Sequence, residues 1–87
     1  MSLAEAATVA DGTEVSVEGV LFVTADEMRL CGAIGESNPV QCLGDNVPVT
    51  GVDPADHAMG SGGPGVEISA APVLLEGTME QGTLVTQ

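Results

Sequence analysis

The feature that most constrains the fold is the regular alternation of apolar and polar side chains over residues 14–24. One face carries Val15, Val17, Gly19, Leu21 and Val23, and the other carries Glu14, Ser16 and Glu18. A period of two with β-branched residues is typical of a half-buried β-strand. Val20 and Phe22 are apolar as well, so we expect the later part of this strand to be covered on both faces.

Further strands are predicted where apolar runs lie between turn residues: residues 28–34, 47–52, 66–80 with an interruption at Pro72, and 83–86. Residues 25–27 are a polar hairpin connection. On the second strand, Met28, Leu30 and Ile34 face one way, and Arg29 and Cys31 face the other. Residues 35–46 are predicted to be irregular, and residues 53–65 to form a long glycine-rich connection. Gly51 indicates a bulge or bend in the third strand.

Two similar tripeptides indicate how the strands close. Val17-Glu18-Gly19 and Leu75-Glu76-Gly77 both place a glycine on an apolar face, which permits the sharp bend found at barrel corners. The sequence therefore predicts an all-β fold: a five-stranded OB-like barrel with a glycine-rich loop between strands three and four. A small β-sandwich is the alternative. The shared core should contain Val15, Val17, Leu21, Leu30, Val47, Val49, Val73, Leu75 and Leu84.

The predicted domain spans residues 12–87. Residues 1–11 are assigned to a cloning scar, Met1-Ser2-Leu3, followed by a linker or one frayed helical turn. No apolar run approaches the roughly 20 residues of a membrane span, and residues 1–11 lack the pattern of a signal peptide. We expect no direct membrane insertion by this segment, and we expect that a native leader has been removed.

Charge excludes one class of partner. Thirteen acidic residues stand against one basic residue, Arg29, giving a net charge of −12. Nucleic-acid binding requires clustered Lys and Arg, and single-strand binding also requires aromatic platforms, whereas Phe22 is the only aromatic residue. We therefore predict no nucleic-acid partner. The scattered carboxylates favour solubility or adaptation to salt over a dedicated cation-attracting surface.

A stretch with two cysteines resembles a known family. The residues are Leu30-Cys31-Gly32-Ala33, Glu36-Ser37-Asn38-Pro39-Val40-Gln41-Cys42 and Val47-Pro48-Val49, followed by the closing segments 72–79 and 82–86. They resemble a family of small, uncharacterised exported proteins and lipoproteins of actinobacteria, over nearly the whole chain from Glu14 onward. Gly32, Val40 and Leu43 depart from the family pattern. The resemblance implies export and an OB-like barrel, and it supplies no catalytic residues.

Cys31 and Cys42 are interpreted as a structural disulfide. A bond closing a loop of about a dozen residues would contribute roughly 2–3 kcal/mol. It requires an oxidising compartment, which the resemblance implies. A metal site is the alternative, but the spacing lacks the paired short intervals of zinc ligands, and His57 would add only a third donor. No redox Cys-x-x-Cys is present. We predict no metal and no cofactor.

The remaining candidate residues are interpreted as parts of loops that carry no catalytic or ligand-binding chemistry. His57 and Ser61 could belong to a hydrolytic triad, but they are too close together on a flexible loop. Residues 60–65 superficially resemble a phosphate loop but lack the following Gly-Lys-Ser/Thr. Asp45, Asp53 and Asp56 do not fit a calcium-binding loop.

The sequence therefore predicts a non-enzymatic extracytoplasmic module, structural or protein-binding, existing as a monomer or weak dimer. Its partner, a protein or a small ligand, is not identified by the residues. The alternative is a domain that binds a small ligand or a cation through its acidic loops, and a hydrolase is a more distant possibility.

Overall fold

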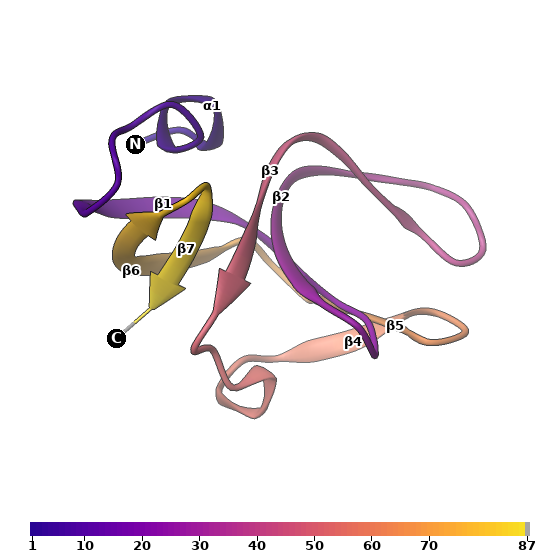
Figure 1. The fold of residues 1–87 in the computed structure, drawn as a ribbon. Helices are drawn as coiled ribbons and strands as arrows, with labels where there is room; N and C mark the ends of the chain where they lie inside the picture. The colour runs from indigo at the N-terminus through magenta and orange to yellow at the C-terminus, as the bar shows by residue number, and fades with distance from the viewer. Residues whose placement is uncertain (87) are drawn as a thin grey trace.

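A computed structural model describes residues 1–86, which form a single seven-stranded sheet with one short α-helix and one 3-10 helix (Figure 1). The elements are α1 Leu3–Ala6, β1 Thr13–Val23, β2 Met28–Gly35, β3 Gln41–Thr50, η1 Pro54–Asp56, β4 Met59–Gly63, β5 Val66–Ser69, β6 Val73–Glu80 and β7 Thr83–Thr86.

The long first strand has the predicted alternation. Val15, Val17 and Leu21 are buried, and the polar residues between them are exposed. Phe22 is also buried, so the end of the strand is covered on both faces. β1 pairs with β6 over residues 13–19, and its last residues then pair with β2 on one edge and with β5 on the other.

Five strands form a closed ring of pairings. β1 pairs with β2, β2 with β3, β3 with β7, β7 with β6, and β6 with β1, and only the β3–β7 pairing is parallel. The predicted all-β fold class is confirmed, and the ring of pairings is compatible with both the barrel-like fold and the small β-sandwich. The number of strands is corrected from five to seven, because β5 is separate from β6 and β4 was not expected.

Gly19 and Gly77 lie where the sequence places the bends. Both are buried, and Gly77 is directly opposite Val15. A Cβ on Gly19 would come within 2.9 Å of the Cys31 carbonyl oxygen, and one on Gly77 would collide with the Val85 carbonyl oxygen. Glycine at these two positions lets neighbouring backbone approach closely enough to close the ring.

The interior of the ring is the main core. Of the nine predicted core residues, seven belong to it and Val73 packs against it while half-buried. Leu21 is fully buried but lies outside this cluster. The complete cluster is Leu3, Ala6, Val15, Val17, Leu30, Val47, Val49, Leu75, Met79 and Leu84.

Residues 1–11, expected to be a linker or one frayed helical turn, contain the helical turn α1 and contribute to the main core. Leu3 and Ala6 are on one face of α1 and are 5% and 1% exposed within the main core. Ser2 caps this helical turn, because its hydroxyl accepts a hydrogen bond from the Glu5 N–H at 3.2 Å. The small ring therefore gains two buried apolar side chains from its N-terminal segment.

Two further expectations about β2 and β3 need correction. Residues 35–46 are not irregular throughout, because β3 begins at Gln41 and pairs with the end of β2. The pairing shifts register between Cys31 and Ala33, where one residue of β2, Gly32, lies opposite two residues of β3, Gly44 and Asp45. Beyond this irregularity Ile34 packs in the cluster that contains Cys31 and not with Leu30. β3 ends at Thr50, where Gly51 turns the chain with a φ of 84°.

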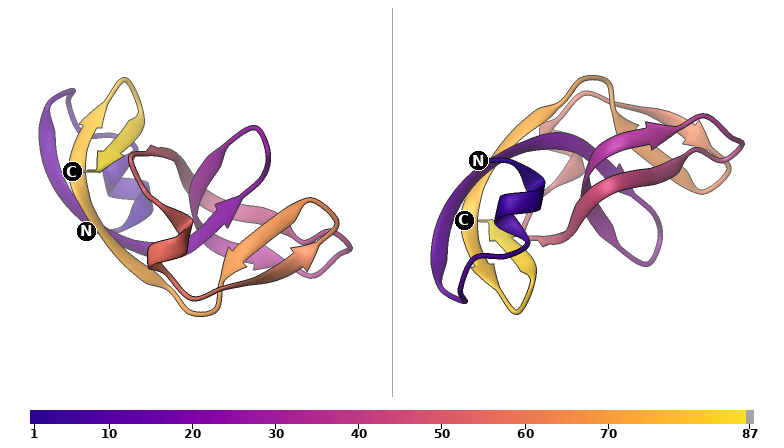
Figure 2. Two further views of the ribbon diagram at one scale, coloured as in Figure 1. Left: turned by 90° about the horizontal axis from the view of Figure 1, so that it is seen from below. Right: turned by 90° about the horizontal axis from the view of Figure 1, so that it is seen from above.

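The glycine-rich connection is not a flexible loop. Its second half forms β4, which pairs antiparallel with β5 from Met59 to Gly63. Composition concealed this strand, because glycine is depleted in strands generally. Figure 2 shows the β4–β5 hairpin and the outer part of the β2–β3 hairpin extending side by side away from the ring.

Candidate functional site

A second, smaller core lies between the two extended hairpins. Its buried members are Phe22, Cys31 and Val66, and the half-buried residues around them are Ile34, Val40, Cys42 and Ile68. The Cys31 and Cys42 sulfur atoms are bonded to each other, and their Cα atoms are 5.7 Å apart. The predicted pairing is therefore present, and the bond lies inside the cluster that joins the hairpins.

Glycines in β4 allow the hairpins to approach each other. A Cβ on Gly62 would come within 2.8 Å of the Val40 side chain, and one on Gly63 within 2.6 Å of the Pro39 Cα. The Val40 N–H donates a hydrogen bond to the Gly62 carbonyl oxygen at 2.7 Å. The glycine-rich sequence thus serves close packing, which its composition alone does not reveal.

Ser69 attaches the hairpin to the ring. Its side chain is buried, and its hydroxyl accepts a hydrogen bond from the Leu21 N–H at 3.0 Å. This bond crosses the interruption between β5 and β6, where the sheet ladder is broken. Sequence reasoning missed Ser69, because only the nearby Pro72 marked the break.

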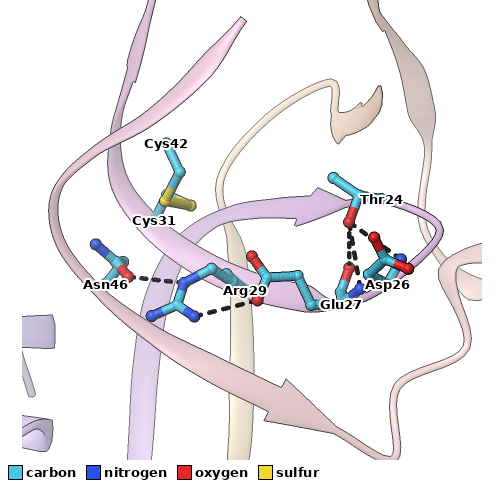
Figure 3. Close-up of polar contacts among 7 residues, drawn as sticks. All are labelled: Thr24, Asp26, Glu27, Arg29, Cys31, Cys42 and Asn46. Carbon is cyan, nitrogen blue, oxygen red and sulfur yellow. Dashed lines mark hydrogen bonds and ion pairs between the residues drawn. A yellow bond between two sulfur atoms is a disulfide. The ribbon is translucent and has the colours of Figure 1, made fainter. Parts of the chain in front are cut away.

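The turn between β1 and β2 is ordered by Thr24 (Figure 3). Its hydroxyl oxygen accepts hydrogen bonds from the N–H groups of Asp26 and Glu27 at 3.3 and 3.2 Å. The Thr24 N–H donates to the Glu27 carbonyl at 2.9 Å. Such a hydroxyl-based turn could have been predicted from a threonine preceding two acidic residues.

Between this turn and the β4–β5 hairpin lies a surface hollow of about 570 Å³. We name it the hairpin hollow. It is lined by residues 23–25 on one side and by residues 59–61, 63 and 65–67 on the other. Most of the lining is backbone and small or apolar side chains, and Glu67 is the one charged residue in it. The lining is suited to contacts with backbone and apolar groups.

Arg29, the only Lys or Arg residue, lies on β2 just after the β1–β2 turn (Figure 3). Its Nε donates to the Asn46 Oδ1 at 2.8 Å, and its guanidinium lies 3.4 Å from the Glu27 carboxylate. Asn46 in turn donates to the Gly44 carbonyl at 2.9 Å. The positive charge is therefore already engaged by groups of the chain.

The structure places the two residues of the possible hydrolytic triad, His57 and Ser61, in different surface depressions. Ser61 lines the hairpin hollow, whereas His57 lies in another depression of about 330 Å³ with Asp53, Asp56 and Glu76. The Ser61 hydroxyl accepts from the Gly63 N–H at 3.2 Å. Asp53 caps η1 by accepting from the Ala55 N–H at 2.9 Å. Within residues 1–86, no group of three or more His, Cys, Asp or Glu side chains is arranged to hold a metal ion.

Comparison of the chain with models of known families, with curated proteins and with solved structures finds no match. Over the described part of the chain, no helix has the length and apolar character needed to cross a membrane.

Proposed function

We propose that this chain is a non-enzymatic extracytoplasmic module that binds a protein partner at the hairpin hollow. The observation that carries the proposal is the hollow itself, which lies between the β1–β2 turn and the β4–β5 hairpin and shares Val66 with the core that contains the disulfide. A disulfide is formed and kept mainly in oxidising compartments, which supports a location outside the cytoplasm. Membership of the actinobacterial exported family would support the same location.

A screen of displayed peptides against the oxidised protein tests this function. We expect enriched peptides whose binding is reproduced in solution by calorimetry. Ala25 is exposed in the wall of the hollow, so Ala25→Trp should fill it and weaken binding about tenfold or more. Ala4→Trp, an equal change on the exposed face of α1, is the matched control. Failure to obtain any peptide that binds in solution would contradict the proposed function.

Binding of a small ligand is the second candidate. The volume of the hairpin hollow, about 570 Å³, falls within the usual range of small-molecule sites, about 300–1,000 Å³. A thermal-shift panel of small molecules, with Ca²⁺ included, separates the two. Stabilisation by a small molecule that is lost in Ala25→Trp, with no peptide hits, would favour this alternative.

A further inference from the structure

We propose that the partner adds an extended, positively charged segment as a strand beside β4. This inference rests on the proposed protein-binding function and names the mode of binding and the chemistry of the partner. It starts from the position of β4, which has β5 as its only neighbouring strand in the part of the chain that the structure describes. The other six strands contribute to the ring or lie inside the sheet order.

The hydrogen-bonding phase of the hairpin shows which groups face the open edge. The Ala70 N–H donates to the Ala58 carbonyl at 2.8 Å, and the register then pairs Gly60 with Ile68. Because bonded and non-bonded pairs alternate in an antiparallel ladder, Met59 and Ser61 direct their N–H and C=O groups away from β5. The edge ends at Gly62, whose carbonyl is taken by Val40.

This edge lacks the usual protection against strand addition. Edge strands are commonly guarded by lysine, by other charged side chains or by proline within the strand. β4 has the sequence Met-Gly-Ser-Gly-Gly, without a charged residue or a proline, and Gly60 and Ser61 are exposed while Met59 is half-buried. An incoming backbone can therefore approach the outward N–H and C=O groups of this stretch. Main-chain hydrogen bonds to an open edge, with side chains in adjacent pockets, are a recurrent mode of peptide recognition.

The negative charge near β4 indicates that the added segment is positively charged. Ser61 is directly opposite Glu67, so both side chains lie on the same face of the hairpin, and both line the hairpin hollow. A strand added beside β4 would lie about 10 Å from β5, two strand spacings, which a lysine and a glutamate side chain can span together. The net charge of −12 attracts a cationic segment and opposes pairing with a second copy of this chain.

An alternating Lys–Val nonapeptide is the probe, and the matching Glu–Val peptide is its control. We expect the Lys–Val peptide alone to bind at about 150 mM salt, where the Debye length is about 8 Å. In hydrogen-exchange measurements it should protect the amides of Met59 and Ser61. Protection confined to other elements, or equal binding of both peptides, would overturn the inference.

Paired variants separate edge pairing from general attraction to an acidic surface. Ser61→Pro removes the outward N–H and should weaken binding about tenfold. Ser61→Ala removes the same hydroxyl, keeps the N–H and should have little effect. Glu67→Lys should weaken binding more than Glu14→Lys, which changes the net charge equally at an exposed site on β1. If Ser61→Pro fails to fold, the amide protection in the unmodified protein and the Glu67 and Glu14 variants still decide the question.

The outcomes also separate this inference from the proposed function. Peptides from the display screen that bind without protecting Met59 and Ser61 would refute the strand-addition mode and leave the binding function intact. Absence of any peptide binding would refute both. Dimerisation in analytical ultracentrifugation, with Met59 and Ser61 protected in the dimer, would replace the basic partner with a second copy and overturn the inference.

Discussion

Leu75 is the residue whose burial the sequence pattern predicts most directly, and the structure places it in the main core at 6% exposed. Leu75→Ala should lower the free energy of unfolding by about 2–5 kcal/mol, through lost apolar burial and the cavity left behind. Glu18 is an exposed residue of β1, so Glu18→Ala should change the free energy of unfolding by no more than about 0.5 kcal/mol. Urea denaturation of both variants checks this, and equal small effects would mean that the register is wrong.

Gly77 allows a second test at the residue scale. A Cβ at this position would collide with the Val85 carbonyl, which belongs to the backbone of β7 and cannot turn aside as a side chain would. Gly77→Ala should therefore lower the free energy of unfolding by about 1–3 kcal/mol. Gly60→Ala is the control, because its Cβ would enter open space. Destabilisation of equal size at Gly60 would show that loss of glycine, and not crowding, is responsible.

At the scale of elements, the disulfide should stabilise the two extended hairpins more than the ring. Cys31 and Cys42 belong to the smaller core, whereas the ring is filled by a separate cluster. Reduction should lower the melting temperature, since a bond closing so short a loop contributes roughly 2–3 kcal/mol. Amides of β4 and β5 should lose hydrogen-exchange protection first. Uniform loss of protection across β1, β6 and the hairpins would contradict this division.

The chemistry of the bond is checked separately. Alkylation of the unreduced protein followed by mass spectrometry should show no free thiol at Cys31 or Cys42. The same protein alkylated after reduction and unfolding is the control, and it should carry two labels. Two labelled cysteines in oxidised material would contradict the pairing.

The elements that sequence reasoning found are those whose side-chain pattern is set locally. β1 and β6 alternate between apolar and polar residues, so their faces follow from the period alone. β4 could not be found this way, because its glycines are selected by the approach of Pro39 and Val40 from another hairpin. Ile34 was assigned to the side of Leu30, but it packs with Cys31 beyond an irregularity in the β2–β3 pairing that has no local signature in the sequence of β2. The hairpin hollow depends on the first of these non-local features, because β4 forms part of its lining.

For the whole molecule, the excess of carboxylates should make stability depend on salt. Twelve net negative charges are brought together on folding, and their mutual repulsion is screened as ionic strength rises. We expect the melting temperature to rise between about 10 mM and 500 mM NaCl, over which the Debye length falls from about 30 Å to a few ångströms. Neutral osmolyte of matched osmolality is the control. A melting temperature that falls with salt would show that favourable ion pairs outweigh the repulsion.

The excess of negative charge also determines which charged polymers the molecule can bind. Arg29 is the only basic residue, and its guanidinium is already bonded to Asn46 and close to Glu27. With its one guanidinium engaged, the surface offers no cluster of cations to displace the counterions of a phosphate backbone. Phe22, the only aromatic side chain, is buried and cannot stack on a base. Fluorescence anisotropy with single- and double-stranded DNA should therefore show no binding at micromolar protein in moderate salt. Polylysine, with the opposite charge, should bind at low salt and be released as salt rises. Binding of DNA under these conditions would refute the electrostatic argument, because it would require a recognition surface that neither the charge nor the side chains of this domain supply.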